Sequence, residues 1–404
     1  MPTSDLFRLS VQNRPVERTL GLPVIDTVTA SRTFGDAETA WRDLEARAVT
    51  TPYQRFDWVE SWYRHIGAAS GLEPLIVTAW TKEAQPVFLW PFVVRTAGKR
   101  RVAEWPGGKF ANYKMGLYDR RVADTLDRDA LVPMMAYLRD ELGIDALSLT
   151  NQPETWRGVA NPLIHLPHQR SPSYAYSVVL RPDFEALYGE LRSSSTRKKL
   201  RRSERRIVSQ FGSCTLRRPT SPEDVDRVLG AFFEQKSDRL RQKQLQNVFA
   251  RPGVMAFLRE LATRGIGQDD PLLDLYWLDT GGQVAATWAG TTARGRLSGI
   301  INSFDLGAVA QYQPGEVILR MLLEDACDRG LIEFDLGVGE AAYKDSWCPR
   351  IDRLFDSFLP LSASGWMHTS VTMTGFRLKR VAKQSKFLRE LSERFRQVPA
   401  RKGR

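Results

Sequence analysis

The sequence predicts a mixed α/β fold of two similar halves, and three observations support this prediction. Each half contains runs of branched and aromatic residues that are typical of strands. In each half such runs precede an amphipathic helix that leads to a further short strand, which indicates a mixed sheet flanked by helices. A stretch rich in Pro, His and Ser at 151–173 separates the halves and has the composition of a linker. The similar element order suggests a structural duplication, although no residue-level repeat is visible.

The first half is predicted to begin with two helices. Residues 1–28 lack sustained periodicity and are expected to form a flexible leader. Residues 36–48 place apolar side chains at helical spacing behind Asp36, the expected N-cap, and residues 51–67 predict a second, aromatic-rich helix. The order continues with strands at 72–80 and 86–95, a helix at 130–142 and a strand at 146–150.

The second half repeats this order with more strands. After a strand at 174–180, helical residues follow, with a predicted break at the serine run 193–195. A strong helix begins at Pro314 and stops at Gly330, because proline suits the first turn of a helix and glycine its C-terminal stop. The other predicted elements are strands at 213–219, 272–279, 283–293, 296–304 and 332–337 and helices at 222–240 and 252–264.

The net charge of +11 is concentrated in two segments. Residues 192–206 carry eight Lys or Arg and one Glu, and residues 371–404 carry eleven Lys or Arg and two Glu. The rest of the chain is therefore mildly acidic. This distribution argues against a protein that coats nucleic acid over its whole surface, so no DNA partner is expected, and it predicts two local anion-binding patches.

Other sequence features favour a cytoplasmic protein without a metal. No apolar run reaches the about 20 residues that a membrane-spanning helix requires, and the N-terminus has no apolar signal-peptide core. The three scattered cysteines are too few for a disulfide framework or a zinc site, and the four distant histidines show no metal-binding spacing.

The C-terminal segment is predicted to form a basic amphipathic helix. Such a helix can lie on an anionic membrane surface, and docking on its own domain is equally compatible with the pattern. We therefore expect a cytoplasmic protein that makes peripheral contact with the inner membrane through residues 371–404. The apolar side of the helix would carry Val381, Leu388, Leu391, Phe395 and Val398.

Residues 296–347 hold the pattern that carries chemistry: a strand, a loop of small residues, a Pro-Gly helix start, a helix and a second strand. A helix start presents unpaired N–H groups and partial positive charge, which can hold a pyrophosphate, and Gly315 would let an anion approach the backbone closely. Two strands that splay apart would leave edge groups free to pair with an amide-containing cofactor arm. From the spacing alone, ordinary helix-start chemistry is the favoured explanation of Pro-Gly.

The segments 304–319 and 329–347 resemble the signature of the CelD-type (cellulose-biosynthesis-associated) acetyltransferases of the GNAT superfamily, relatives of the FemAB peptidoglycan aminoacyltransferases. The resemblance extends to 41–65 and 191–207, so it covers most of residues 36–358. It implies two tandem GNAT-like domains, each with a mixed, mostly antiparallel sheet flanked by helices. It also implies acyl-donor binding in the second domain and acceptor binding in the cleft between the two.

On this basis we expect four parts in the chain. They are a flexible leader (1–28), an N-terminal GNAT-like domain on the acceptor side (29–175), a C-terminal GNAT domain on the acyl-donor side (176–365) and a basic amphipathic tail (366–404). The resemblance places the pyrophosphate of an acyl-CoA on the loop before the helix at Pro314. The loop departs from the usual Q/R-x-x-G-x-G/A pattern, and its expected contacts are Gln311, Tyr312, Gln313, Gly315 and Glu316.

Acyl transfer from a thioester needs a base for the nucleophile, donors for the oxyanion and an acid for the leaving thiolate. Asp335 or Glu340 could be the base, and Tyr312 or Tyr343 could protonate the thiolate. Lys344 lies where the FemAB relatives carry a functionally important lysine. Expected substrate contacts are Asn112 and Tyr113 in the first domain, Arg197 and Lys198 in the basic cluster, and Trp347.

The leading hypothesis is transfer of an acyl group, expected to be acetyl, from acyl-CoA to an amine or hydroxyl of a sugar or polysaccharide-related acceptor by direct attack. One alternative is FemAB-type aminoacyl transfer from tRNA to an envelope precursor. A second is a GNAT scaffold that takes part in polysaccharide synthesis without catalysis. The departure of the phosphate loop from the usual pattern favours the scaffold. The polar loop from Gly337 to Trp347 favours an enzyme.

Overall fold

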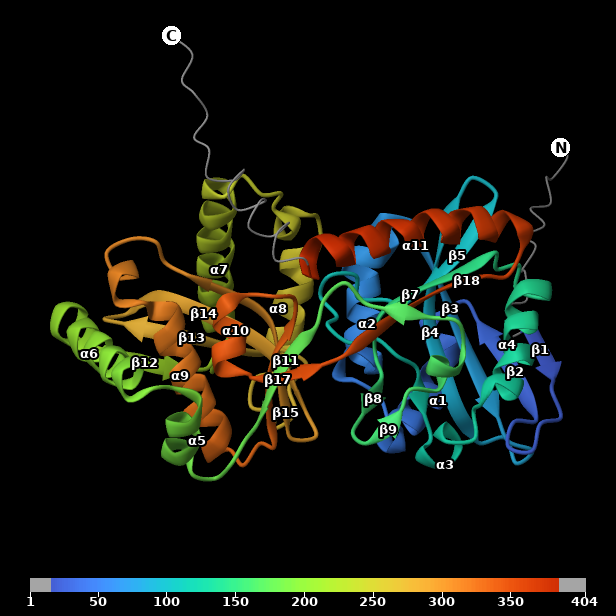
Figure 1. The fold of residues 1–404 in the computed structure, drawn as a ribbon, viewed down its shortest axis with the longest axis horizontal. Helices are drawn as coiled ribbons and strands as arrows, with labels where there is room; N and C mark the ends of the chain where they lie inside the picture. The colour runs from blue at the N-terminus through green and yellow to red at the C-terminus, as the bar shows by residue number, and fades with distance from the viewer. Residues whose placement is uncertain (1–15, 385–404) are drawn as a thin grey trace, which may run out of the picture.

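The computed structural model describes residues 16–384. Two sheets lie side by side and each is covered by helices (Figure 1). The first half of the chain builds most of one sheet and the second half builds most of the other. The predicted mixed α/β class is therefore confirmed.

The first sheet has the strand order β1-β2-β3-β4-β5-β7-β18-β10, with β6 paired to β4 beside this path. Its long strands, β3 (Leu72–Trp80) and β4 (Pro86–Ala97), are buried over most of their length, which explains their nearly continuous apolar sequence. Strand β1 (Val16–Thr19) lies within the expected leader, whereas residues 1–15 lie outside the described part. The remaining strands are β2 (Thr27–Ser31), β5 (Arg100–Glu104), β6 (Leu117–Tyr118), β7 (Ala146–Pro153), β10 (Gln169–Arg170) and β18 (Leu354–Pro360).

The second sheet has the order β12-β13-β14-β15-β16-β11-β17. Strands β13, β14 and β15 form the predicted meander, and two-residue turns join them at Gly281–Gly282 and Arg294–Gly295. A separate small hairpin, β8 (Thr155–Trp156) with β9 (Val159–Ala160), forms in the stretch expected to be a linker. The strands are β11 (Ala175–Val179), β12 (Thr215–Arg217), β13 (Asp274–Thr280), β14 (Gln283–Ala293), β15 (Arg296–Phe304), β16 (Glu333–Val338) and β17 (Arg350–Asp352).

Both sheets share one topological feature, which supports the suggested duplication. Each is antiparallel except for one parallel pair, β5 with β7 in the first sheet and β15 with β16 in the second. A parallel pair needs a crossover, and α4 (Arg128–Asp140) and α9 (Pro314–Asp328) provide it in the two sheets. The late strand β18 returns to the first sheet and pairs with β7, so the two halves are tied together by the chain.

The helices follow the sequence pattern with three local differences. Thr33, rather than Asp36, caps α1 (Phe34–Arg47), because its hydroxyl accepts the Asp36 amide. The aromatic helix expected at 51–67 is α-helical only at α2 (Phe56–Trp62), and a short helix, α10 (Ala342–Trp347), forms where a loop was expected. The others are α3 (Arg120–Ala123), α5 (Phe184–Leu191), α6 (Ser194–Phe211), α7 (Pro222–Gln242), α8 (Val254–Arg264) and α11 (Ala363–Gln384).

Helices α7 and α8 connect the two halves through packing. Apolar residues of both helices belong to the same buried cluster as the core of the first sheet. Trp58 of α2 and Phe257 of α8 meet edge to face at 5.3 Å. This packing fixes the second sheet against the first, and a functional site can therefore be built from both.

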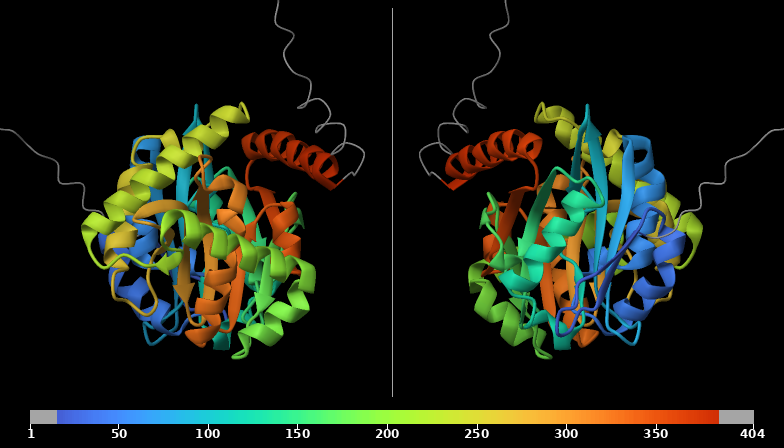
Figure 2. Two further views of the ribbon diagram at one scale, coloured as in Figure 1. Left: turned by 90° about the vertical axis from the view of Figure 1, so that its left-hand side faces the viewer. Right: turned by 90° about the vertical axis from the view of Figure 1, so that its right-hand side faces the viewer.

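Helix α11 lies on the outer surface beside the first sheet (Figure 2). It packs on β18 through Phe376, whose ring lies 5.0 Å from that of Phe358. Gly365 fits directly against the backbone of Asp145, where a Cβ atom would come within 1.8 Å of a carbonyl oxygen. No helix in the described part of the chain is both long and apolar enough to cross a bilayer.

Candidate functional site

Strands β15 and β16 run side by side and then separate. Their pairing ends at Ser298 and Asp335, although β15 continues to Phe304 and β16 to Val338. Strand β15 also changes register against β14 at this point. The two strands therefore open a wedge beyond these residues.

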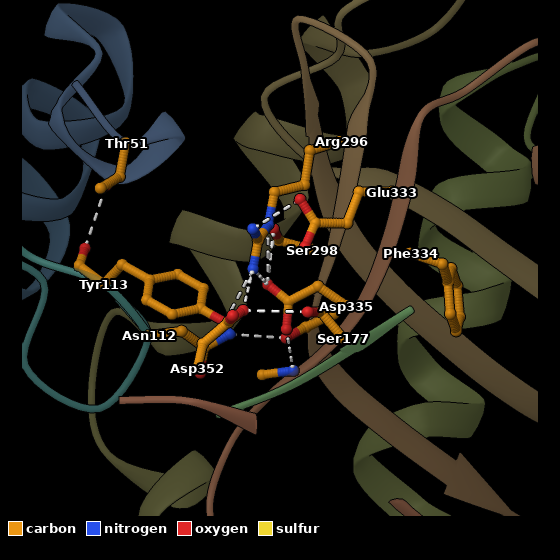
Figure 3. A network of polar contacts seen from close by, with 12 residues as sticks. Thr51, Asn112, Tyr113, Ser177, Arg296, Ser298, Glu333, Phe334, Asp335 and Asp352 are labelled. Carbon is orange, nitrogen blue, oxygen red and sulfur yellow. Dashed lines mark hydrogen bonds and ion pairs between the residues drawn. The ribbon is translucent and has the colours of Figure 1, made fainter. Parts of the chain in front are cut away.

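An ion-pair network lies at the closed end of this wedge (Figure 3). The Arg296 guanidinium Nη2 lies 2.9 Å from Asp335 Oδ2 and 3.2 Å from Asp352 Oδ2, and its Nη1 lies 2.8 Å from Glu333 Oε2. The rings of Tyr113 and Trp156, from the first half of the chain, lie against the same guanidinium. Three carboxylates and two aromatic rings thus fix one arginine at the junction of the halves.

Both oxygens of Asp335 are occupied. The Ser298 hydroxyl donates to Oδ2 at 2.9 Å, and the Gly337 amide donates to Oδ1 at 2.6 Å. Asp335 is fully buried. It lines neither of the two cavities near this site, one at the N-terminus of α9 and one between the two halves of the molecule. The geometry suits a carboxylate that holds Arg296 in place.

Burial and charge act together on the groups of this network. Burial alone would lower the pKa of Arg296, but the negative charge of Asp335 and its neighbours raises it well above the usual value. Burial, followed by the charge of Asp335, raises the pKa of Tyr113 and of Tyr53. At neutral pH the arginine is therefore charged and both phenols keep their protons.

Asn112 bridges the two strands where they part. Its Nδ2 donates to Gly299 O of β15 at 2.6 Å, and its Oδ1 accepts the Val338 amide of β16 at 3.3 Å. Asn112 Nδ2 also donates to Tyr53 Oη at 2.9 Å. The first edge groups beyond the strand pairing are thus taken by a side chain from the other half and are not left free.

A cavity of about 480 Å³ opens at the N-terminus of α9. The helix start at Gln313, Pro314 and Gly315 forms one wall, and the Gly315 amide has no hydrogen-bond partner among residues 16–384. Gln313 has a left-handed backbone with φ 56°, which turns the chain into the helix. Three cations, Arg192, Lys199 and Arg239, also line this cavity, which we call the donor cavity after the role that the resemblance implies for it. Free amide, helix terminus and cations together suit a phosphate or diphosphate.

Glu316 is held at the edge of the donor cavity. Its Oε2 accepts from Arg192 Nη2 at 2.6 Å and from the Trp347 indole at 3.1 Å. Trp347 is buried and stacks on Tyr188 with an interplanar angle of 6°. Trp347 therefore acts on the cavity through Glu316 and does not line it.

A larger cavity of about 970 Å³ lies between the two halves of the molecule. Its floor includes Tyr113, Arg296, Glu333 and Asp352 of the ion-pair network. Its walls come from both halves, with the β8–β9 hairpin on one side and the β14–β15 turn on the other. We call it the acceptor cavity, after the role that the resemblance implies for the space between the halves. The acceptor cavity and the donor cavity meet the same strand, β15, at opposite ends.

Residues 194–345 match the family model described as the acetyltransferase (GNAT) domain. The matched segment contains α6, the wedge, the donor cavity loop and Lys344. This match supports an acyltransferase. No curated protein matches the chain in the comparison by sequence.

Solved structures with the same fold come from several proteins. FemX aligns with a TM-score of 0.55 at 10% identity, over 81% of this chain and 96% of its own. A conserved Bacteroides thetaiotaomicron protein of unknown function aligns with a TM-score of 0.51 at 13% identity, over 81% and 97%. The C-terminal domain of a candidate lysylphosphatidylglycerol synthetase from Agrobacterium fabrum aligns with a TM-score of 0.50 at 8% identity, over 84% and 96%. These likenesses show the shared fold.

The structure brings most of the sequence-predicted residues of the GNAT segment to the wedge or the donor cavity. Tyr343 lines the donor cavity and accepts a hydrogen bond from Asn302 at 3.2 Å. Lys344 is buried, and its Nζ donates to the carbonyls of Gly337 at 3.0 Å and Val338 at 3.2 Å. Glu340 accepts the Tyr174 amide at 3.1 Å and lines neither cavity.

Other predicted residues lie away from both cavities. Gln311 is exposed and bonds to a neighbouring carbonyl, and Tyr312 is buried with its hydroxyl donating to Gln210 of α6. Arg197 pairs with Glu185 at 4.0 Å, and Lys198 lines a separate groove along α6. Of the residues predicted to contact the pyrophosphate, Gln313, Gly315 and Glu316 therefore line the donor cavity, and Gln311 and Tyr312 do not.

Sequence reasoning did not select Arg296, the centre of the network, nor its partners Ser298, Glu333 and Asp352. A usable signal existed for three of them. Arg296 and Ser298 alternate with Leu297 on one predicted strand, and Glu333 and Asp335 alternate with Phe334 on the next. Since alternate residues share a face of a strand, polar pairs on two neighbouring strands indicate a polar network. No sequence signal connects Asp352 to this group.

Proposed function

We propose that this protein is an acyltransferase that moves an acyl group from an acyl-CoA in the donor cavity to an acceptor in the larger cavity. One observation carries the proposal: β15 contributes Asn302 to the donor cavity and Arg296 to the acceptor cavity. The stretch of strand between them spans about 20 Å, which suits a donor whose phosphate group and reactive carbon are joined by a long arm. The CelD-type resemblance implies an amine or hydroxyl of a sugar or polysaccharide precursor as the acceptor.

Helix α10 contributes two side chains to the proposed reaction, Tyr343 and Lys344. When the acceptor attacks the thioester carbonyl, the carbon–sulfur bond breaks and the thiolate takes a proton. The thiolate receives the proton that the acceptor loses, through the carboxylate of the acceptor cavity that accepts it. Tyr343 accepts a hydrogen bond from Asn302 at the phosphate end of the donor arm, and burial raises the pKa of its phenol, so we give it the role of a hydrogen-bond donor to the phosphate group. Lys344 adds positive charge at the end of β16, which favours a developing oxyanion.

The nucleophile's proton goes to a carboxylate of the acceptor cavity. Glu333 and Asp352 line this cavity, whereas Asp335 and Glu340 do not. We therefore give the role of base to Glu333 or Asp352, and to Asp335 the role of holding Arg296. Seven arginines line the same cavity.

An aminoacyl-tRNA donor is the second candidate, because α6 carries a basic surface next to the donor cavity. Lys198, Arg202, Arg205 and Arg206 are exposed and form no ion pair within the described part of the chain. Such a row of cations can follow a phosphate backbone. The scaffold hypothesis predicts that neither donor binds.

Two neighbouring lysines separate these candidates. Lys199 lines the donor cavity, and Lys198 faces the groove along α6. Calorimetric titration should show acetyl-CoA bound by the wild type, several-fold weaker binding by Lys199→Gln and unchanged binding by Lys198→Gln. Binding of charged tRNA that depends on Lys198, without acetyl-CoA binding, would establish the second candidate. If the wild type binds neither acetyl-CoA nor charged tRNA, both transferase candidates are excluded.

A further inference from the structure

Two hairpin turns, one from each half of the chain, present an arginine to the acceptor cavity. Arg157 and Gly158 join β8 to β9, and Arg294 and Gly295 join β14 to β15. Both arginines line the cavity. Although 137 positions separate them in the sequence, their charges are close enough to interact.

Turn chemistry does not explain the choice of arginine at either place. Arg157 has φ 51° and Arg294 has φ 49°, in the left-handed region that disfavours long side chains. A two-residue hairpin turn usually has asparagine or glycine at its first position and glycine at its second. A residue kept against the backbone preference at two matching positions points to a role of its side chain.

No carboxylate of residues 16–384 forms an ion pair with either guanidinium. Arg157 forms no ion pair with any described residue, and partial burial followed by the charges of Arg294 and Arg120 lowers its pKa. Arg294 donates through Nη2 to the carbonyls of Glu45 and Ala46, at 3.0 Å each, at the end of α1. The fold therefore gathers like charges and anchors one of them without a counter-charge.

The paired arginines of the same cavity form a clear contrast. Arg42, Arg55, Arg296 and Arg350 each pair with a carboxylate. These pairs lie at the floor and the first-half wall. Three arginines of the cavity have no ion-pair partner among residues 16–384: Arg157 and Arg294 lie on the facing turns, and Arg353 follows β17. The excess positive charge is thus placed where a ligand would enter between the turns.

We propose that the two Arg–Gly turns form a clamp for an anionic group of the acceptor, a phosphate or a carboxylate. Guanidinium groups bind both anions through two parallel hydrogen bonds, and two of them facing each other hold the anion from both sides. The identification of this ligand as the acceptor rests on the proposed function. Anion binding by the clamp does not, because it requires no donor and no turnover.

The test replaces each arginine by the residue that the turn itself prefers. Arg157→Asn and Arg294→Asn remove the charge and keep the left-handed turn, so the fold is expected to persist. Arg251→Asn is the matched control, because Arg251 is exposed and lines none of the cavities described here. The probes are inorganic phosphate and acetate, titrated calorimetrically at constant ionic strength.

Wild type and Arg251→Asn should bind one more phosphate than the double variant Arg157→Asn/Arg294→Asn, and each single variant should weaken this site at least 10-fold. Any phosphate that the double variant still binds is attributed to the donor cavity. Acetate binding with the same dependence on both arginines would assign the clamp to carboxylates. Equal phosphate and acetate binding by wild type and double variant overturns the proposal, whether or not acetyl-CoA binds.

A second surface carries an independent inference. Along α11, Met367, Val371, Leu378 and Val381 follow one side of the helix and are between 57% and 72% exposed, and Trp366 beside them is 64% exposed. This stripe continues the apolar side predicted for the tail, whose other members lie outside the described residues. Arg377 and Lys379 flank it and are also exposed.

We infer that this stripe docks on an anionic lipid surface. Residues 371–404 carry eleven Lys or Arg against two Glu, which complements anionic headgroups and disfavours a second copy of the same helix. A tryptophan at the edge of the stripe suits the interface between headgroups and acyl chains. The acceptor-cavity turns lie on the opposite side of the molecule in Figure 1, so docking would leave them open.

Vesicle sedimentation of the full chain tests this inference. Wild type should bind vesicles containing phosphatidylglycerol, in a salt-dependent way, and should not bind pure phosphatidylcholine. Trp366→Ser/Leu378→Ser should bind at least 5-fold less, whereas Val132→Ser, which changes a 51% exposed valine of α4, should bind as wild type. The inference is overturned if Trp366→Ser/Leu378→Ser binds vesicles as strongly as the wild type. It is also overturned if the protein binds no vesicles and instead forms a dimer that depends on Leu378.

Discussion

Arg296 and Asp335 face each other across the parallel pair β15–β16, with Nη2 2.9 Å from Oδ2. The Asp335 side chain is fully buried and the Arg296 side chain is 13% exposed. A pair of this kind contributes little net stability when intact, but loss of one partner leaves an uncompensated buried charge. The pair therefore fixes the geometry of the junction between the two cavities.

Arg296→Met should lower the free energy of unfolding by about 3–5 kcal/mol, because it strands the Asp335 carboxylate in the interior. Urea denaturation checks this value. Arg350→Met is the control, since Arg350 pairs with Glu333 and Asp352 but its side chain is 53% exposed. It should cost less than about 1 kcal/mol. Equal losses for the two variants would show that burial does not set the strength of the Arg296 pair.

Gly337→Ala should separate Asn112 from the wedge. Gly337 has φ +73°, and a Cβ atom there would lie 2.5 Å from Asn112 Nδ2 and 2.7 Å from Gly299 O. Gly339 has φ +107° with no atom within 4 Å of its Cβ position, so Gly339→Ala carries the backbone strain alone. We expect Gly337→Ala to be the less stable variant by about 2 kcal/mol, with faster hydrogen exchange at the Val338 amide. Equal stability and exchange in both variants would contradict the bridge.

The sequence predicted the elements well where local chemistry decides them. The break before α6 follows from Ser193, whose hydroxyl caps the helix, and the α9 start follows from Pro314. The polar loop residues Asn112 and Tyr113 were also expected at an acceptor-side surface. In the structure they lie with Arg296 because two sheets pack together, which no local pattern specifies.

Pairings between distant segments could not be predicted. Strand β18 joins the first sheet although it follows the second half, and Asp352 reaches Arg296 only because β17 pairs with β11. The hairpin at Arg157 was assigned to a linker, since two strands of two residues leave too short a pattern to detect. Hence the floor of the acceptor cavity was partly expected, and its arginine turns were not.

Lys114 should make stability depend on pH in the alkaline range. Burial lowers the pKa of this lysine from 10.5 to about 8, against the opposing charges of Glu104 and Asp356. Between these two values the unfolded chain binds the proton and the folded chain does not, so stability rises with pH and the cost of burying the charge is fully present below pH 8. Lys114→Met should flatten this rise, by up to about 3 kcal/mol. Urea denaturation of both proteins at several pH values measures it, and parallel curves would contradict the prediction.

Lys344→Ala should remove turnover while the fold persists. The Lys344 side chain is buried and holds the carbonyls of Gly337 and Val338 at the end of β16, where the proposed reaction would place the oxyanion. Loss of one oxyanion donor typically lowers kcat by about 10²–10³-fold, with little change in KM. Asp345→Ala changes the exposed neighbour on the same short helix and should keep wild-type rates. Steady-state kinetics with acetyl-CoA and an amino-sugar acceptor provides the comparison. Wild-type kcat in Lys344→Ala, or a loss confined to KM, would exclude the lysine from the chemical step.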